Sequence, residues 1–236
     1  STGSKVGSVF KSVLGANLIS SALTKGVSVL TSNLGGAIQR FDTLNKYPTV
    51  MKSLGYSVDD VAKSTKILSD GIDGLPTTLD GITAISQQLA PLTGSATKAS
   101  ESAIALNNAF LASGAGADGA SRGLQQYTQM LSTGKVDMMS WRTLQETMPI
   151  ALRKTAEAFG YTGKAATNDL YEALKSGSIT MDELNDKFIE LNKGQNGFAE
   201  LAKQNSAGIG TSFSNLRNSV AKNLANMLTD IDKAFS

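Results

Sequence analysis

The sequence predicts an all-α fold, a compact bundle of short helices flanked by longer amphipathic helices at both ends. Apolar residues recur at spacings of three and four over most of the chain, as along the buried face of a helix. Ser, Thr or Asp precede these periodic segments and Gly follows them, which is typical of helix ends. Alternating apolar and polar runs bounded by hairpin turns are absent from the 236-residue sequence.

The amino-acid composition excludes several kinds of functional site. The chain contains no His and no Cys, which excludes imidazole bases, thiolate nucleophiles, Cys/His metal sites and disulfides. Charged residues make up only 18% of the sequence, and their signs are interspersed with a net charge of +2. Because no basic stripe is present to bind phosphates, we expect no specific nucleic-acid partner.

Residues 1–40 are predicted to form a Gly/Ser-rich helix. Their most apolar part is 6–38, but Lys11 and Lys25 leave uncharged runs of about 13 residues, short of the roughly 20 that a spanning helix needs. Three interpretations stay open: a water-exposed or oligomer-packed helix, a segment that meets a membrane only after a conformational change, or a disordered segment. The sequence also lacks an initial Met, and we expect it to be a segment of a longer protein.

Residues 41–123 are predicted as a helical region. One helix ends at Gly55, a second begins after Ser57, and Gly71 ends that second helix. Pro91 is predicted to terminate or kink the next helix. The apolar positions of the helix that follows are Ala103, Leu106 and Phe110.

Residues 124–193 are predicted as a compact subdomain of four short helices, and 194–236 as a linker and the start of a long amphipathic helix. The predicted turn residues are Gly134, Pro149, Gly160 and Gly177. The predicted core residues are Trp141, Leu144, Leu152, Phe159, Leu184 and Phe188. An Asp in place of Leu152 or Phe159 would then bury an unpaired charge and unfold the subdomain.

Three short stretches resemble phosphate-binding or metal-binding motifs, but the residues around them do not match such sites. Residues 114–119 read Gly-Ala-Gly-Ala-Asp-Gly, but a helical pattern precedes them where a dinucleotide loop needs a strand. Gly134-Lys135 lacks the upstream glycine of a phosphate-binding loop, because Gln129 stands there. Three aspartates lack the ligand spacing of an EF-hand: Asp70, Asp73 and Asp80. We expect no catalytic residue, cofactor or metal site.

Residues 124–191 resemble the N-terminal domain of phage tape measure proteins. That family shows a Gln-containing helix, a Gly-Lys-β-branched turn and a helix containing Leu-Gln. A Pro-led helix follows that ends at an aliphatic or aromatic residue plus Gly, and a second turn with a glycine, a β-branched residue and a small cap opens the last helix. The matching positions are Gln125, Gly134, Lys135, Val136, Leu144, Glu146, Pro149, Phe159, Gly160, Gly177, Ile179 and Leu184.

The resemblance implies a structural, non-enzymatic virion protein of a long-tailed phage or prophage. Such proteins are largely helical, lie in the lumen or at the tip of the tail tube, set tail length, nucleate tube assembly and leave ahead of the DNA. The implied partners are the tail tube protein, tail assembly chaperones, distal tail or baseplate proteins, and further copies of the chain. Assembly would take place in the host cytoplasm.

An alternative function is a membrane-active, channel-forming segment used in genome delivery. Residues 6–38 would then insert into the host membrane. Gain of helix on binding liposomes would support this alternative, and indifference to lipid would weaken it.

Overall fold

The structure is a computed structural model that describes residues 43–206. These residues form helices joined by short loops, with no β-strand among them, which confirms the predicted all-α class. The predicted segment 1–40 and most of the predicted segment 194–236 lie outside the described residues. Between residues 43 and 206, no helix is long and apolar enough to cross a membrane.

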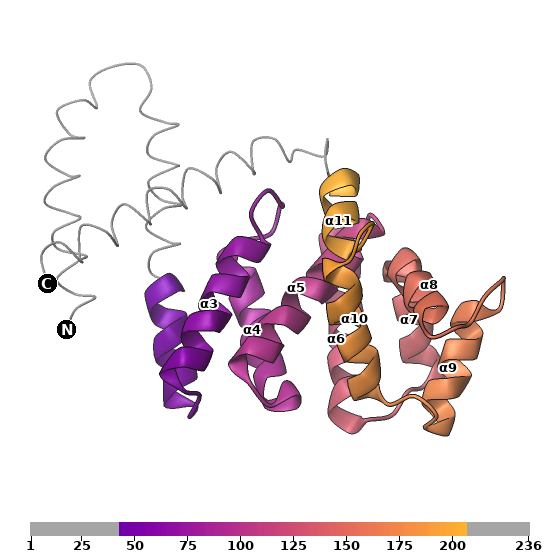
Figure 1. The fold of residues 1–236 in the computed structure, drawn as a ribbon, viewed down its shortest axis with the longest axis horizontal. Coiled ribbons are helices and arrows are strands. Elements are labelled where there is room, and N and C mark those ends of the chain that lie inside the picture. Colours follow the sequence, from indigo (N-terminus) through magenta and orange to yellow (C-terminus); the bar gives the residue numbers. More distant parts are fainter. Residues whose placement is uncertain (1–42, 207–236) are drawn as a thin grey trace, which may run out of the picture.

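The helices lie side by side as a bundle (Figure 1). Residues 43–53 are helical where the description begins. The helices that follow are α3 (Val58–Gly71), α4 (Leu79–Thr93), α5 (Ala96–Ala112), α6 (Ala117–Thr133), α7 (Met138–Thr147), α8 (Pro149–Ala158), α9 (Ala166–Ser176), α10 (Met181–Lys193) and α11 (Phe198–Ser206).

Short polar side chains begin many of these helices. Each accepts a hydrogen bond from the backbone N–H three residues later, which satisfies a donor that the first turn leaves free. The capping residues are Ser57, Thr78, Ser95, Asp137 and Thr180. Gly94, Gly134 and Gly177 end α4, α6 and α9 with a positive φ, where a side chain would be strained.

Helix α4 does not end at Pro91, so of the two predicted effects of this proline, termination is wrong and a kink stays a prediction. The helix continues to Thr93, and Gly94 ends it. Proline removes one backbone N–H donor, but the next turn still closes, since the N–H of Gly94 donates to the carbonyl of Ala90 at 3.2 Å. Near a C-terminus, one missing hydrogen bond does not stop the helix.

Helix α5 is the centre of the bundle. It packs against α3, α4, α10 and α11, and Figure 1 shows it between the N-terminal and C-terminal helices. Of its 17 residues, 12 are buried, and most of these are Ala or Ser. Small side chains let several helices approach α5 closely, and burial on nearly every side explains why its central stretch is uncharged.

The N-terminus of α5 is capped from another helix. Asp60 of α3 accepts hydrogen bonds from the backbone N–H groups of Ala96 and Thr97, both at 2.8 Å, and from the Thr97 hydroxyl at 2.6 Å. Ser57 accepts the N–H of Asp60, but the Asp60 carboxylate does not complete a capping box in its own helix. It fixes α3 to the positive end of the α5 dipole instead.

One hydrophobic core runs through the described residues, from Tyr47 near their start to Phe198 in α11. Because α5 contributes to packing on both sides, this core is continuous across residues 123 and 124. The burial of Phe198 also carries it beyond residue 193. The predicted division into 41–123 and 124–193 therefore stays a prediction about the sequence and marks no gap in the packing.

Candidate functional site

The loop with the glycine-rich motif connects two helices. Residues 113–116 lie between the end of α5 and the start of α6, and Gly119 is already inside α6. A dinucleotide site needs this loop to leave a β-strand, so the arrangement does not fit one. Among the described residues, no group of three or more carboxylates is placed to hold a metal ion.

The residues singled out from the sequence fall into two groups. Five of the predicted core side chains are fully buried: Trp141, Leu144, Leu152, Leu184 and Phe188. The four predicted turn residues lie at helix ends. Pro149 is the first residue of α8, and Gly134, Gly160 and Gly177 have φ values of +68°, +95° and +81°. These residues shape the bundle and do not converge on a common cavity.

Phe159 departs from the prediction of a core residue, because its side chain is only half-buried. It follows the last residue of α8, where the helix closes and the chain turns away from the core. Lys187 of α10 lies 5.3 Å from the centre of its ring. Phe159 therefore packs at the edge of the core, with one face toward a cation.

Buried polar side chains connect the N-terminal helices. The Tyr47 hydroxyl lies 2.6 Å from the Ser64 hydroxyl and 2.8 Å from the Ser86 hydroxyl. Ser100 of α5 is within hydrogen-bond distance of both serines and donates to the carbonyl of Ala96 at 2.8 Å. This cluster joins residues 43–53, α3, α4 and α5 inside the core, where each hydroxyl needs a partner.

A second polar contact joins α5, α6 and α10. The side-chain oxygen of Asn185 accepts hydrogen bonds from Ser102 at 2.6 Å and from Tyr127 at 2.8 Å. Burial raises the pKa of Tyr127 well above its usual value, so its hydroxyl stays protonated as a donor. The Tyr127 ring also stacks on Phe188, with ring centres 5.5 Å apart. Asn185 is thus an acceptor shared by two neighbouring helices.

Sequence reasoning missed these polar contacts. Its signal for buried residues was apolar periodicity, and Ser and Asn carry none. One sign was available, because residues 102–116 contain no charged residue over more than three helical turns. A helix uncharged on all faces is typically buried, and its polar residues are then expected to be hydrogen-bonded.

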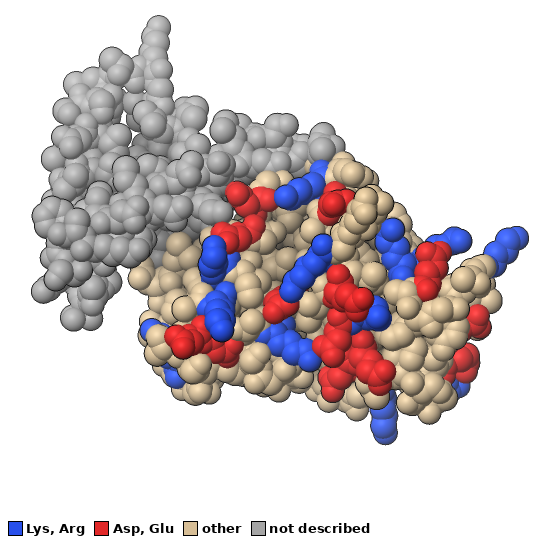
Figure 2. All heavy atoms as spheres, in the orientation of Figure 1, with Lys and Arg blue, Asp and Glu red and all other residues tan. Residues whose placement is uncertain are grey.

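The outer surface carries charges of both signs side by side (Figure 2). Lys98 of α5 pairs with Asp186 of α10 at 2.8 Å, and Glu101 pairs with Lys193 at 2.6 Å. Exposed pairs of this kind contribute only about 0–1 kcal/mol each. They therefore add little to the stability of the α5–α10 contact. The view of Figure 2 shows no single-sign face that would suit nucleic acid.

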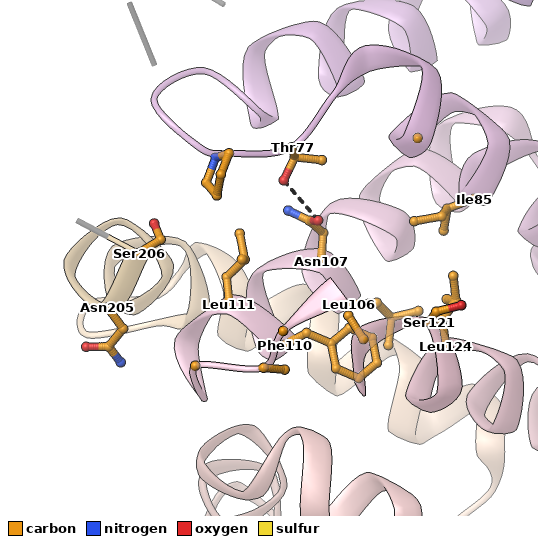
Figure 3. A pocket seen from close by; sticks show the side chains of 16 residues that line it. Thr77, Ile85, Leu106, Asn107, Phe110, Leu111, Ser121, Leu124, Asn205 and Ser206 are labelled. Atoms are coloured by element: carbon orange, nitrogen blue, oxygen red, sulfur yellow. Dashed lines mark hydrogen bonds between the residues drawn. The ribbon is translucent and has the colours of Figure 1, made fainter. Parts of the chain in front are cut away.

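One cavity in the described residues is open to the surface and mostly apolar. Its volume is about 570 Å³, and it lies where α4, α5, α6 and the end of α11 meet. Figure 3 shows Leu106, Phe110 and Leu124 close together, with Asn205 and Ser206 of α11 at the opposite side. Asn107 in the pocket accepts a hydrogen bond from Thr77 at 3.0 Å. No charged side chain is found among the described residues that line this apolar pocket.

Stability should depend on the ionisation of Asp60. Burial acts to raise its pKa, but the hydrogen bonds from Thr97 and Ala96 outweigh it and hold the pKa below the usual 3.8. The stabilisation is therefore fully present above pH 3.8 and is lost as the pH falls through the lower folded value. We expect Asp60→Asn to be less stable than wild type at pH 7, with the difference narrowing toward pH 2.

Urea denaturation of both proteins at pH 7, 4 and 2.5 checks this expectation. Asp59→Asn is the matched control, since it makes the same change one residue earlier in the same helical turn. Parallel pH profiles for wild type and Asp60→Asn would contradict the role of Asp60.

Comparison with known protein families gives a match over most of the chain. The profile of the tape measure protein family matches residues 35–229. No curated protein and no solved structure gives a significant match. The family match covers all the described helices and most of the chain. The chain therefore belongs to the tape measure protein family, whose members are structural, non-enzymatic components of the phage tail that take part in its assembly.

Proposed function

We propose that residues 43–206, which we call the folded module, act as a compact unit that nucleates assembly of the tail tube. The tape measure protein sets tail length through parts of its chain outside this module. Members of the family associate with other phage tail proteins. For the folded module we propose the tail assembly chaperones and the tail tube protein as partners, together with distal tail or baseplate proteins.

The convergence of distant segments on α5 carries this proposal. In one continuous extended helix, Glu101 and Lys193 would lie roughly 140 Å apart, at about 1.5 Å per residue. In the structure their charged groups are 2.6 Å apart. Extending the chain would also separate Asn108 from Asn192, whose side chains are hydrogen-bonded at 2.8 Å. If these residues were extended to measure tail length, the whole hydrophobic core of the module would be lost.

A folded module also suits one end of the tail better than the length of its lumen. Helices lying side by side are several times wider than a single helix of about 10 Å diameter. We therefore propose that the module lies at the tail tip or at the site where the tube starts to polymerise. Assembly of the tail would take place in the host cytoplasm.

Tail length in a phage with a second, in-frame copy of residues 58–206 tests the proposal. If these residues act as a folded unit, electron microscopy should show tails of unchanged length. If they lie extended as helix, the tails should be longer by roughly 220 Å. Such lengthening would overturn the proposal and make the segment part of the ruler.

The nucleating role needs a variant that keeps the chain length constant. Leu152→Asp in the full-length protein changes only the fold of the module, because Leu152 is fully buried. We expect far fewer tails, while those that form keep their normal length. A normal number of tails would contradict nucleation by the folded module. Ile150→Asp, at a partly exposed position in the same helix, should assemble tails normally.

A further inference from the structure

The apolar pocket lies where the described chain ends. Asn205 and Ser206, the last two residues of α11, form part of its lining (Figure 3). The Asn205 side chain donates a hydrogen bond to the carbonyl of Ala112, which holds the end of α11 against the end of α5. Whatever follows Ser206 therefore starts at the edge of the pocket.

The sequence directly after Ser206 is uncharged and contains apolar side chains, as does the lining of the pocket. Residues 207–216 contain no charged residue, and the first charge is Arg217. Within this stretch, Ile209, Phe213 and Leu216 follow the spacing of an apolar helical face. An uncharged pocket accepts apolar side chains without leaving a buried charge unpaired.

We propose that residues 207–216 of this chain fill the apolar pocket, with Ile209 and Phe213 packed against α4, α5 and α6. Residue 213 is seven positions after Ser206, and an extended chain of that length reaches at most about 25 Å. The attachment to α11 also gives the segment a high effective concentration at the pocket. The family match continues through residue 229, so it includes this segment.

The absence of cysteine from the sequence makes a direct test possible. In the full 236-residue chain, Ser121→Cys marks the pocket wall and Ser212→Cys marks the proposed occupant. Under mild oxidation this pair should form an intramolecular disulfide several times faster than the control pair Asp169→Cys with Ser212→Cys. Asp169 lies on α9, which does not line the pocket.

Adding Phe213→Ser to the Ser121→Cys and Ser212→Cys chain should reduce the rate of disulfide formation to that of the control pair. Equal rates for the two pairs, or no effect of Phe213→Ser, would overturn the proposal. So would disulfides that form mainly between two chains, because the occupant would then be a second copy. A third pair, Ser121→Cys with Ser32→Cys, tests the N-terminal segment as the occupant. Faster disulfide formation in this pair than in the Ser121→Cys and Ser212→Cys pair would assign the pocket to the N-terminal segment.

Hydrogen exchange gives a second measurement that needs no cysteine. In the full chain, Phe213→Ser should accelerate amide exchange in the pocket wall, residues 106–124, while Phe235→Ser should not. Unchanged exchange in the Phe213→Ser chain would overturn the proposal even if the cysteine variants failed to fold.

Discussion

Leu152→Asp is expected to remove about 3–8 kcal/mol from the stability of the folded module. Leu152 is fully buried on α8, which packs against α5, α9 and α10. Loss of a buried Leu side chain alone costs about 2–5 kcal/mol. The new carboxyl group adds the cost of burying a polar group without a partner, about 1–3 kcal/mol. Domains of this size are stable by only about 5–15 kcal/mol.

The measurement is thermal unfolding followed by circular dichroism and by the fluorescence of Trp141. This residue is the only Trp in the sequence, and it is fully buried, so its emission reports on the core. Ile150→Asp is the matched control, since the same substitution is made at a side chain that is 39% exposed. A melting curve of Leu152→Asp that overlays the control would show that α8 does not pack as described.

Phe159→Asp should have a smaller effect than Leu152→Asp, contrary to the expectation from sequence that both would unfold the protein. The Phe159 ring is half-buried, and Lys187 lies near it. An Asp at this position would remain hydrated and close to a positive charge. The ranking of the two variants therefore separates the core of the bundle from its edge.

Asn185→Leu is expected to destabilise the module by about 2–6 kcal/mol. Leu has the same number and branching of side-chain heavy atoms as Asn, so the change removes hydrogen bonds without opening a cavity. It leaves the hydroxyls of Ser102 and Tyr127 buried without their acceptor. Each orphaned donor costs about 1–3 kcal/mol.

A double-mutant cycle with Tyr127→Phe makes this test specific. Tyr127→Phe removes one of the two orphaned hydroxyls, so the double variant should be more stable than the sum of the single effects predicts. Urea denaturation of the four proteins gives the coupling energy. Strict additivity would mean that the hydrogen bond between Tyr127 and Asn185 contributes nothing to stability.

The helices and their ends could be predicted from the sequence because interactions between residues close in sequence determine them. A cap such as Asp137 or Thr180 acts on a backbone N–H three residues away, and the glycines at 134 and 177 act within one turn. The central position of α5 could not be predicted in this way. Its burial depends on α10 and α11, which lie about 70 to 100 residues later in the chain.

The polar contacts and the pocket depend on tertiary structure for the same reason. Nothing near Asn185 in sequence distinguishes it from an exposed Asn, and its two donors lie 58 and 83 residues away. The pocket forms only where four helices meet, so no local pattern predicts its walls. For Phe159, periodicity indicated the correct side of the helix, but α8 ends before that position reaches the core.

The central position of α5 has a consequence for how the protein is made. When α5 leaves the ribosome, roughly 90 residues must still be translated before α11 can cover it. At about 5–20 residues per second, that interval lasts roughly 5–20 s. During this time the small and apolar faces of α5 lack part of their final cover. A binding partner present at the ribosome would find its target on the nascent chain, and would lose it when α11 has also left the ribosome.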